Sequence, residues 1–95
     1  MVIRSFRRKE VELFFESGKL PKKCPWAIVS RIAKRKLDML HFASELHDLK
    51  TPPSNHLEKL VGNFDGFYSI RINDKWRIVF EWNLGPKTVD IIDYH

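Results

Sequence analysis

The chain has 95 residues, of which 43% are hydrophobic and 13% aromatic. This length suits one domain, residues 1–95, with a core that needs no covalent staple. Its single cysteine, Cys24, excludes an internal disulfide and a zinc site built on several thiolates. Charges near the start argue against a signal peptide, and no apolar run approaches the roughly 20 residues of a membrane helix. We therefore expect a soluble, cytoplasmic protein.

The charge is uneven along the chain. Residues 1–36 hold 11 Lys and Arg against 3 Asp and Glu, whereas residues 37–95 hold 6 against 9, for a total net charge of +5. A basic half indicates either attraction to a polyanion such as nucleic acid or simply a solvated basic surface.

The first half predicts a short strand and two helices. "VIRS" (Val2–Ser5) is typical of an opening strand, and Ser5 can cap a helix that begins at Phe6. Gly18 suits the left-handed end of that helix. Apolar residues at helical spacing predict a second helix from Trp26 to about Leu46.

The second half changes to the alternating pattern of strands. Strands are predicted over Phe67–Asn73, Trp76–Trp82 and Thr88–Asp93. The expected fold is therefore α+β, in the order β-α-α-β-β-β. Two helices would pack on one face of a small, mainly antiparallel sheet.

The hydrophobic pattern also predicts the register of the central hairpin. A three-residue loop, Asn73–Lys75, gives one apolar sheet face and sets Arg71 directly opposite Arg77. Like charges at that position repel, which favours an anion such as phosphate between them. Alternatively, Glu81 or an acid of the final strand neutralises them. The face predicted to be open carries Ser69, Arg71, Arg77, Val79 and Glu81.

The chain ends on "DYH", Asp93, Tyr94 and His95, at the end of the last predicted strand. These residues should lie near the arginine face, although strict alternation from Ile91 sends Asp93 to the core side. Histidine is the usual general base, an aspartate can orient it, and a tyrosine can stack on a nucleobase.

The sequence resembles the HigB-type toxins of the RelE superfamily. The resemblance covers nearly the whole chain and is strongest over Asp48–Trp82, with the G-x-x-x-G of Gly62–Gly66, "YSIR", "WRI" and the terminal "DYH". It implies a compact β-α-α-β-β-β fold and a metal-free endoribonuclease without a cofactor. Such toxins cut messenger RNA in the ribosomal A site, inhibit translation and are silenced by a HigA-like helix-turn-helix antitoxin.

The resemblance also assigns residues. The family's catalytic arginine falls on Arg77, and its terminal acid, tyrosine and histidine fall on Asp93, Tyr94 and His95. The sequence departs from the family where relatives can carry an active-site His and Lys, since Glu58 and Val61 stand there instead. His56 and Lys59 are candidate substitutes, and Glu58 is a candidate base.

These assignments fit the chemistry of RNA cleavage, which needs a base for the 2′-OH, cations on the phosphate and an acid for the leaving oxygen. His95 is the expected base, oriented by Asp93. Arg77, with Arg71, would stabilise the phosphate, and Tyr94 would position the nucleotide. The alternatives are a non-catalytic RNA-binding or interaction module on the same fold and, more weakly, a DNA-binding regulator.

Two further groups of residues have competing interpretations. A basic helix face could contact ribosomal RNA or only aid solubility; it consists of Arg31, Lys34 and Arg35. A metal could use the spacing of His41, Glu45 and Asp48, but we favour a surface ion pair and expect no metal site. Trp76 and Trp82 are expected in the core, and Cys24 in an inert loop.

Overall fold

A computed structural model describes residues 2–94 of the chain. The helices are α1 (Lys9–Ser17) and α2 (Ser30–Phe42), and the strands are β1 (Glu58–Lys59), β2 (Phe67–Arg71), β3 (Trp76–Trp82) and β4 (Pro86–Asp93). The strands form one antiparallel sheet in the order β1-β2-β3-β4. The predicted α+β class is confirmed.

Short 3₁₀ helices occupy the connections. They are η1 (Ala27–Val29), η2 (Leu46–Lys50), η3 (Pro53–Asn55) and η4 (Gly62–Phe64). Within residues 2–94, no helix is long and apolar enough to cross a bilayer.

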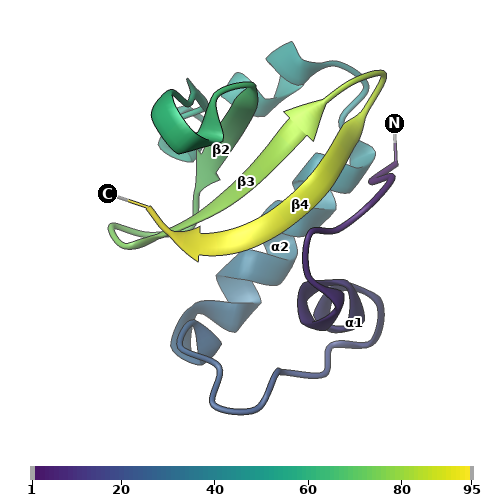
Figure 1. Cartoon of the computed structure of the whole chain (residues 1–95), viewed down its shortest axis with the longest axis vertical. Helices are drawn as coiled ribbons and strands as arrows, with labels where there is room; N and C mark the ends of the chain where they lie inside the picture. Colours follow the sequence, from purple (N-terminus) through teal and green to yellow (C-terminus); the bar gives the residue numbers. More distant parts are fainter. Residues whose placement is uncertain (1, 95) are drawn as a thin grey trace.

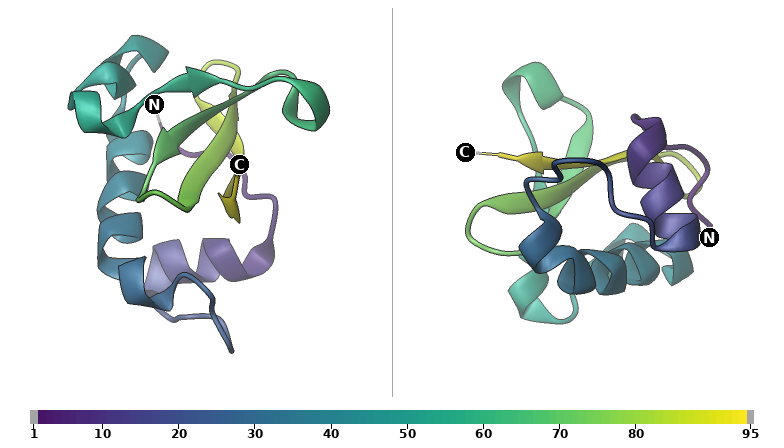
Figure 2. Two further views of the ribbon diagram at one scale, coloured as in Figure 1. Left: turned by 90° about the vertical axis from the view of Figure 1, so that its left-hand side faces the viewer. Right: turned by 90° about the horizontal axis from the view of Figure 1, so that it is seen from below.

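One face of the sheet carries the core. α2 lies against this face, and α1 crosses α2 beside the β4 edge (Figures 1 and 2). Val11 and Phe14 of α1 are buried with Leu37 and Leu40 of α2, and with Ile78 of β3. Each helix therefore buries one apolar stripe, as the helical spacing predicts. Trp26 belongs to this core, and Trp76 and Trp82 pack against it, which confirms their assignment.

The predicted central hairpin is confirmed in its register. Arg71 stands opposite Arg77, and Ile70 opposite Ile78. The loop is held by Asn73, whose side chain accepts hydrogen bonds from the backbone N–H groups of Lys75 (2.9 Å) and Trp76 (2.7 Å). The observed β2 ends at Arg71, two residues before the predicted end.

The N-terminal predictions were partly wrong. Val2–Ser5 forms no strand. It runs along β4, and the next residue, Phe6, makes one parallel bridge with Val89. α1 begins at Lys9 with Arg8 at its N-cap, because the Ser5 hydroxyl accepts a hydrogen bond from the Thr88 N–H (2.9 Å) instead of capping the helix.

The helix ends follow local capping. Gly18 ends α1 in the predicted left-handed conformation, with φ 79°. α2 ends at Phe42, earlier than the predicted Leu46, because Glu45 and Asp48 form a capping box that begins η2.

Candidate functional site

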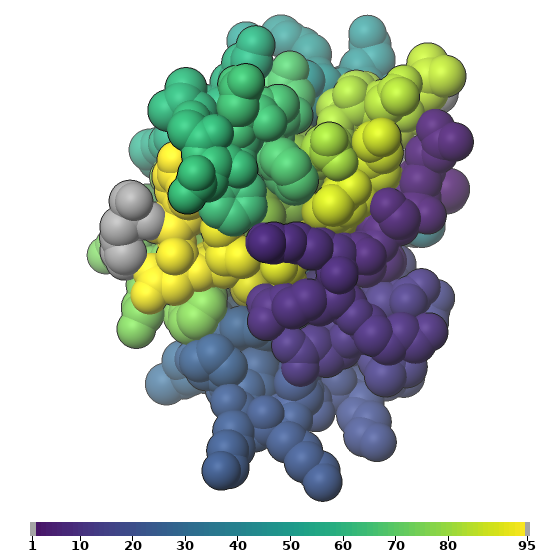
Figure 3. Space-filling model, in the orientation of Figure 1, coloured from purple at the N-terminus to yellow at the C-terminus, as the bar shows by residue number. Residues whose placement is uncertain are grey.

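The second face of the sheet, opposite α2, carries Arg77. β1 extends the sheet beside β2, the segment through η4 lies over one end of this face, and the N-terminal segment borders the outer side of β4 (Figures 1 and 3). This face was predicted to be open, but Ser69 and Val79 at its centre are fully buried. The prediction missed β1 and η4, which lack the length and periodicity of a recognisable strand or helix.

Arg77 is held by three acceptors. Its Nη1 donates to the Ser69 hydroxyl (2.9 Å) and to the His56 carbonyl (3.4 Å), and its Nη2 donates to the Glu58 carboxylate (3.0 Å). The side chain is 17% exposed. Within residues 2–94, these bonds leave the Nε–H and one Nη2–H of the guanidinium for a ligand. Arg77 is thus oriented but not saturated, as a phosphate-binding arginine needs to be.

Arg71 has a different environment. Its guanidinium pairs with Asp74 of the hairpin loop, and its side chain lines a hollow with Arg35 and Ser54. The two opposed arginines therefore each have a carboxylate of their own. The alternative in which Glu81 neutralises them was wrong, because Glu81 accepts a hydrogen bond from the Thr88 hydroxyl (2.7 Å).

The four residues at and beside the family's His and Lys positions do not form one cluster. Glu58 pairs with Ser69 on the Arg77 face, whereas Lys59 pairs with Tyr68 and lies on the opposite face. His56 contributes its backbone carbonyl to Arg77 and has a left-handed φ of 45°. Val61 is exposed and makes no side-chain hydrogen bond by its chemistry.

The terminal residues divide between the two faces. Asp93 pairs with Trp76, and its carboxylate lies 3.9 Å from the Lys75 ammonium, so it lies on the core side as alternation predicted. Tyr94 instead packs edge-on against Phe64 of η4, with ring centroids 5.9 Å apart. Phe64 in turn packs on Phe67, a β2 residue of the Arg77 face (5.5 Å). The assigned base His95 lies outside the described residues.

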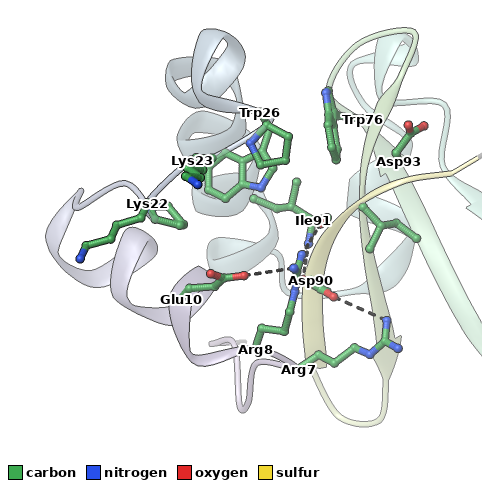
Figure 4. A pocket seen from close by; sticks show the side chains of 14 residues that line it. Arg7, Arg8, Glu10, Lys22, Lys23, Trp26, Trp76, Asp90, Ile91 and Asp93 are labelled. Atoms are coloured by element: carbon green, nitrogen blue, oxygen red, sulfur yellow. Dashed lines mark hydrogen bonds and ion pairs between the residues drawn. The ribbon is translucent and has the colours of Figure 1, made fainter.

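A cleft of about 660 Å³ lies between β4 and the loop that precedes η1 (Figure 4). Trp26 and Trp76 form two of its walls. Its charged lining residues are Arg7, Arg8, Glu10, Lys22, Lys23, Asp90 and Asp93. Sequence reasoning missed this cleft because its walls come from both ends of the chain.

Cys24 lines the same cleft. Burial raises the pKa of its thiol, an effect that a hydrogen bond from the Trp26 backbone offsets only in part. A thiol with a raised pKa is a poor nucleophile, which favours the interpretation of Cys24 as inert.

The basic helix face lies on α2, which Figure 1 shows behind the sheet. α2 covers the core face, whereas Arg77 lies on the other face. Arg31 and Arg35 are exposed, whereas Lys34 forms an ion pair with Asp38 (2.7 Å) and lies over the Phe15 ring. These three residues therefore do not extend the surface around Arg77.

The suggested metal ligands have other partners. His41 accepts a hydrogen bond from the Ile3 N–H (3.2 Å), and Asp48 accepts from the Ser44 and Glu45 N–H groups (3.0 Å each). The favoured ion pair of His41 with Glu45 was wrong, because the Glu45 side chain accepts from the Asp48 backbone N–H in the capping box. Within residues 2–94, no three His, Cys, Asp or Glu side chains are grouped so that they could hold a metal ion.

Comparison with known proteins gives a consistent result. Residues 4–95 match the family model described as "RelE-like toxin of type II toxin-antitoxin system HigB". Toxin HigB-1 of Vibrio cholerae is 37% identical over 90 residues, covering 95% of this chain and 94% of its own length. Endoribonuclease HigB of Proteus vulgaris is 33% identical over 95 residues, covering 99% and 100%. An uncharacterized protein of Haemophilus influenzae is 34% identical over 77 residues, covering 81% and 75%.

Proposed function

Because the chain belongs to the HigB-like family of RelE-like toxins of type II toxin–antitoxin systems, we propose that it is an endoribonuclease that cleaves messenger RNA. The observation that carries the proposal is Arg77, a largely buried guanidinium fixed by Ser69 and Glu58 with N–H groups left for a phosphate. A relative that matches over 99% of this chain and 100% of its own length is named an endoribonuclease, which supports the same activity.

The proposed reaction is metal-free general acid–base cleavage. His95 takes the 2′-OH proton, with Asp93 as its orienting acid, and Arg77 stabilises the charge that develops on the pentacovalent phosphate. Tyr94 positions the nucleotide, supported by the Phe64 ring. The Glu58 carboxylate accepts from Arg77 and is a candidate second base, while His56 is the candidate acid that protonates the leaving 5′-oxygen.

The proposed setting is the A site of the translating ribosome in the cytoplasm. The proposed partners are messenger RNA, ribosomal RNA and a HigA-like helix-turn-helix antitoxin that neutralises the toxin. Arg31, Lys34 and Arg35 would contact ribosomal RNA from the α2 side, while the Arg77 face holds the message. Arg71 would add a weaker RNA contact beside Arg77, and Lys59 would add one from the opposite face of the sheet.

Expression in cells tests the proposal. Wild-type protein without an antitoxin should arrest growth, and Arg77→Ala or His95→Ala should relieve the arrest at equal protein levels. Arg4→Ala is the matched control, because Arg4 is an exposed arginine whose Nη1 donates to the Asn83 carbonyl. Full toxicity of both Arg77→Ala and His95→Ala would remove these residues from the mechanism.

Cleavage on purified ribosomes tests the chemistry and the setting. Protein stripped with a chelator and shown to contain well under one metal ion per chain should cut A-site message at the untreated rate, and should cut free RNA poorly. Loss of cleavage that only one specific ion restores would contradict the metal-free mechanism.

A second candidate function is a non-catalytic RNA-binding module. The ion pair between Glu58 and Arg77 favours it, because a fixed carboxylate neutralises the cation that the phosphate needs. Under this alternative, wild-type protein binds RNA without cleaving it, and Glu58→Gln tightens binding without producing cleavage. Cleavage by the wild-type protein would exclude it.

A further inference from the structure

The N-terminal segment brings another arginine to the edge of the Arg77 face. The Arg7 N–H donates to the Val89 carbonyl (2.9 Å), which fixes the segment along β4. Asp90 follows Val89 and pairs with Val79, so it lies on the Arg77 face. The Arg7 Nη1 lies 3.5 Å from the Asp90 carboxylate. Figure 4 draws this ion pair as a dashed line. Arg7 therefore reaches this face from beyond β4.

The neighbouring Arg8 has a structural role that Arg7 does not share. Arg8 donates from Nε to Asp90 (2.9 Å), from Nη1 to Glu10 (3.1 Å) and from Nη2 to the Ile91 carbonyl (2.8 Å). The nearly buried Asp90 carboxylate makes its short contacts with Arg8 and the Ile91 N–H (2.8 Å). Arg8 thus makes the close contact with Asp90, whereas Arg7 meets the same carboxylate only at 3.5 Å and makes no hydrogen bond to it within residues 2–94.

The guanidinium of Arg7 is placed over an aromatic ring. Its Cζ lies 5.6 Å from the centroid of Phe64, the same ring that packs edge-on against Tyr94. The Arg7 side chain is 51% exposed. A guanidinium over an aromatic ring is limited in its motion, while its N–H groups remain able to bind a planar or tetrahedral anion.

We propose that Arg7 binds a backbone phosphate of the RNA that flanks the phosphate held by Arg77. The two arginines approach from opposite sides, since Arg77 reaches toward Glu58 of β1 and Arg7 toward Phe64 from the outer side of β4. Tyr94 and Phe64 would then hold the nucleotide between two anchored phosphates. This inference rests on the proposed function and names a second contact for the same substrate.

The test compares Arg7→Gln with Arg4→Gln, which remove the same charge from the same N-terminal segment. The probe is a single-stranded RNA with 2′-O-methyl groups, which cannot be cleaved through the 2′-OH. Arg7→Gln should weaken its binding by about 5–20-fold, as expected for one lost charge-assisted hydrogen bond. Losing one phosphate contact should also lower the slope of log affinity against log salt by about 0.7. Arg4→Gln should match the wild type in both.

The Arg7→Lys variant, the melting temperature of Arg7→Gln and the wild-type activity complete the test. Arg7→Lys should recover part of the affinity and the full salt slope, because it keeps the charge but not the planar fork. Equal losses in Arg7→Gln and Arg4→Gln, or a lower melting temperature of Arg7→Gln with an unchanged salt slope, would overturn the inference. Wild-type protein that neither binds nor cleaves RNA defeats the proposed function, whereas wild-type activity with an unaffected Arg7→Gln variant defeats only the role of Arg7.

Discussion

Two cations hold adjacent residues of one turn from opposite sides of the molecule. Lys36 of α2 donates to the Asn55 side chain within the core, and Arg77 of β3 donates to the His56 carbonyl from the second face. Lys36 is 4% exposed, whereas the Arg77 side chain is 17% exposed. The turn between η3 and β1 is therefore fixed on both sides.

The two cations differ in what they leave available. Asn55 is fully buried and also donates to the Leu49 carbonyl (3.1 Å), so the Lys36 pair is enclosed by the fold. Arg77 keeps part of its guanidinium for a ligand. A buried cation with neutral acceptors stabilises a turn, but only the cation at the surface can meet a phosphate.

The largest expected effect separates activity from stability at Arg77. If Arg77 stabilises the phosphate as proposed, Arg77→Ala should lower RNA cleavage by about 10²–10³-fold, because it removes a preformed donor from the transition state. Its unfolding free energy should fall by about 1–2 kcal/mol, because the ion pair with the half-exposed Glu58 is weak and the buried Ser69 hydroxyl loses one donor. Single-turnover cleavage and urea unfolding measure the two effects. Arg4→Ala is the control. A cleavage loss in Arg77→Ala no larger than that in Arg4→Ala would show that Arg77 has no catalytic role.

Asn55→Ala should produce the opposite result. It leaves the Lys36 ammonium and the Leu49 carbonyl without their buried partner, so we expect a loss of about 3 kcal/mol in unfolding free energy. Cleavage at a temperature where the variant is fully folded should change by only a few-fold. A loss below about 1 kcal/mol in urea unfolding would show that the turn does not depend on this pair.

The pH dependence of stability should reflect the burial of Lys36. Burial, followed by the nearby Arg35, lowers the pKa of Lys36 below its usual range around 10.5. Between the lowered pKa and 10.5 the unfolded chain binds the additional proton, so the contribution of Lys36 to the unfolding free energy rises with pH. That contribution is lost as pH falls through the folded pKa.

Lys36→Met tests this dependence. The unfolding free energy of the wild type minus that of Lys36→Met should increase as pH is raised toward 10.5, because other titrating groups cancel in the difference. Urea unfolding across this range measures it. A difference that is flat or decreases with pH would contradict the lowered pKa.

The smallest effect is expected at Arg71. Its partner Asp74 is almost fully exposed, so their ion pair contributes at most about 1 kcal/mol. Arg71→Thr should leave the unfolding free energy within about 0.5 kcal/mol and weaken RNA binding by only about 3–10-fold. Binding of the 2′-O-methyl RNA measures the second effect. A loss of binding as large as that of Arg77→Ala would give both arginines of the hairpin the same role.

The central hairpin was predictable because its signal is local. Alternation over β2 and β3, with Asn73 in the loop, specifies one register and hence the opposition of Arg71 and Arg77. The same alternation placed Asp93 on the core side. These features follow from neighbouring residues and the period of a strand.

The contacts that define the site were not predictable in the same way. Arg77 meets Glu58 from 19 positions earlier in the chain, and Arg8 meets Asp90 from 82 positions earlier. Neither pair leaves a periodic signal. The two-residue strand β1, which carries Glu58 beside Arg77, is also too short to be recognised from its pattern.

The N-terminal segment determines whether another chain can pair with the outer edge of β4. β4 is an edge strand, but its outer backbone groups are occupied: the Pro86 carbonyl by the Arg4 N–H, both Val89 groups by Ser5 and Arg7, and both Ile91 groups by the Asp90 and Arg8 side chains. From Pro86 to Ile91 the sheet therefore offers no template for an added strand of another chain. This arrangement guards a toxin against edge-to-edge aggregation along β4, and an antitoxin that binds there must use side chains instead of strand pairing.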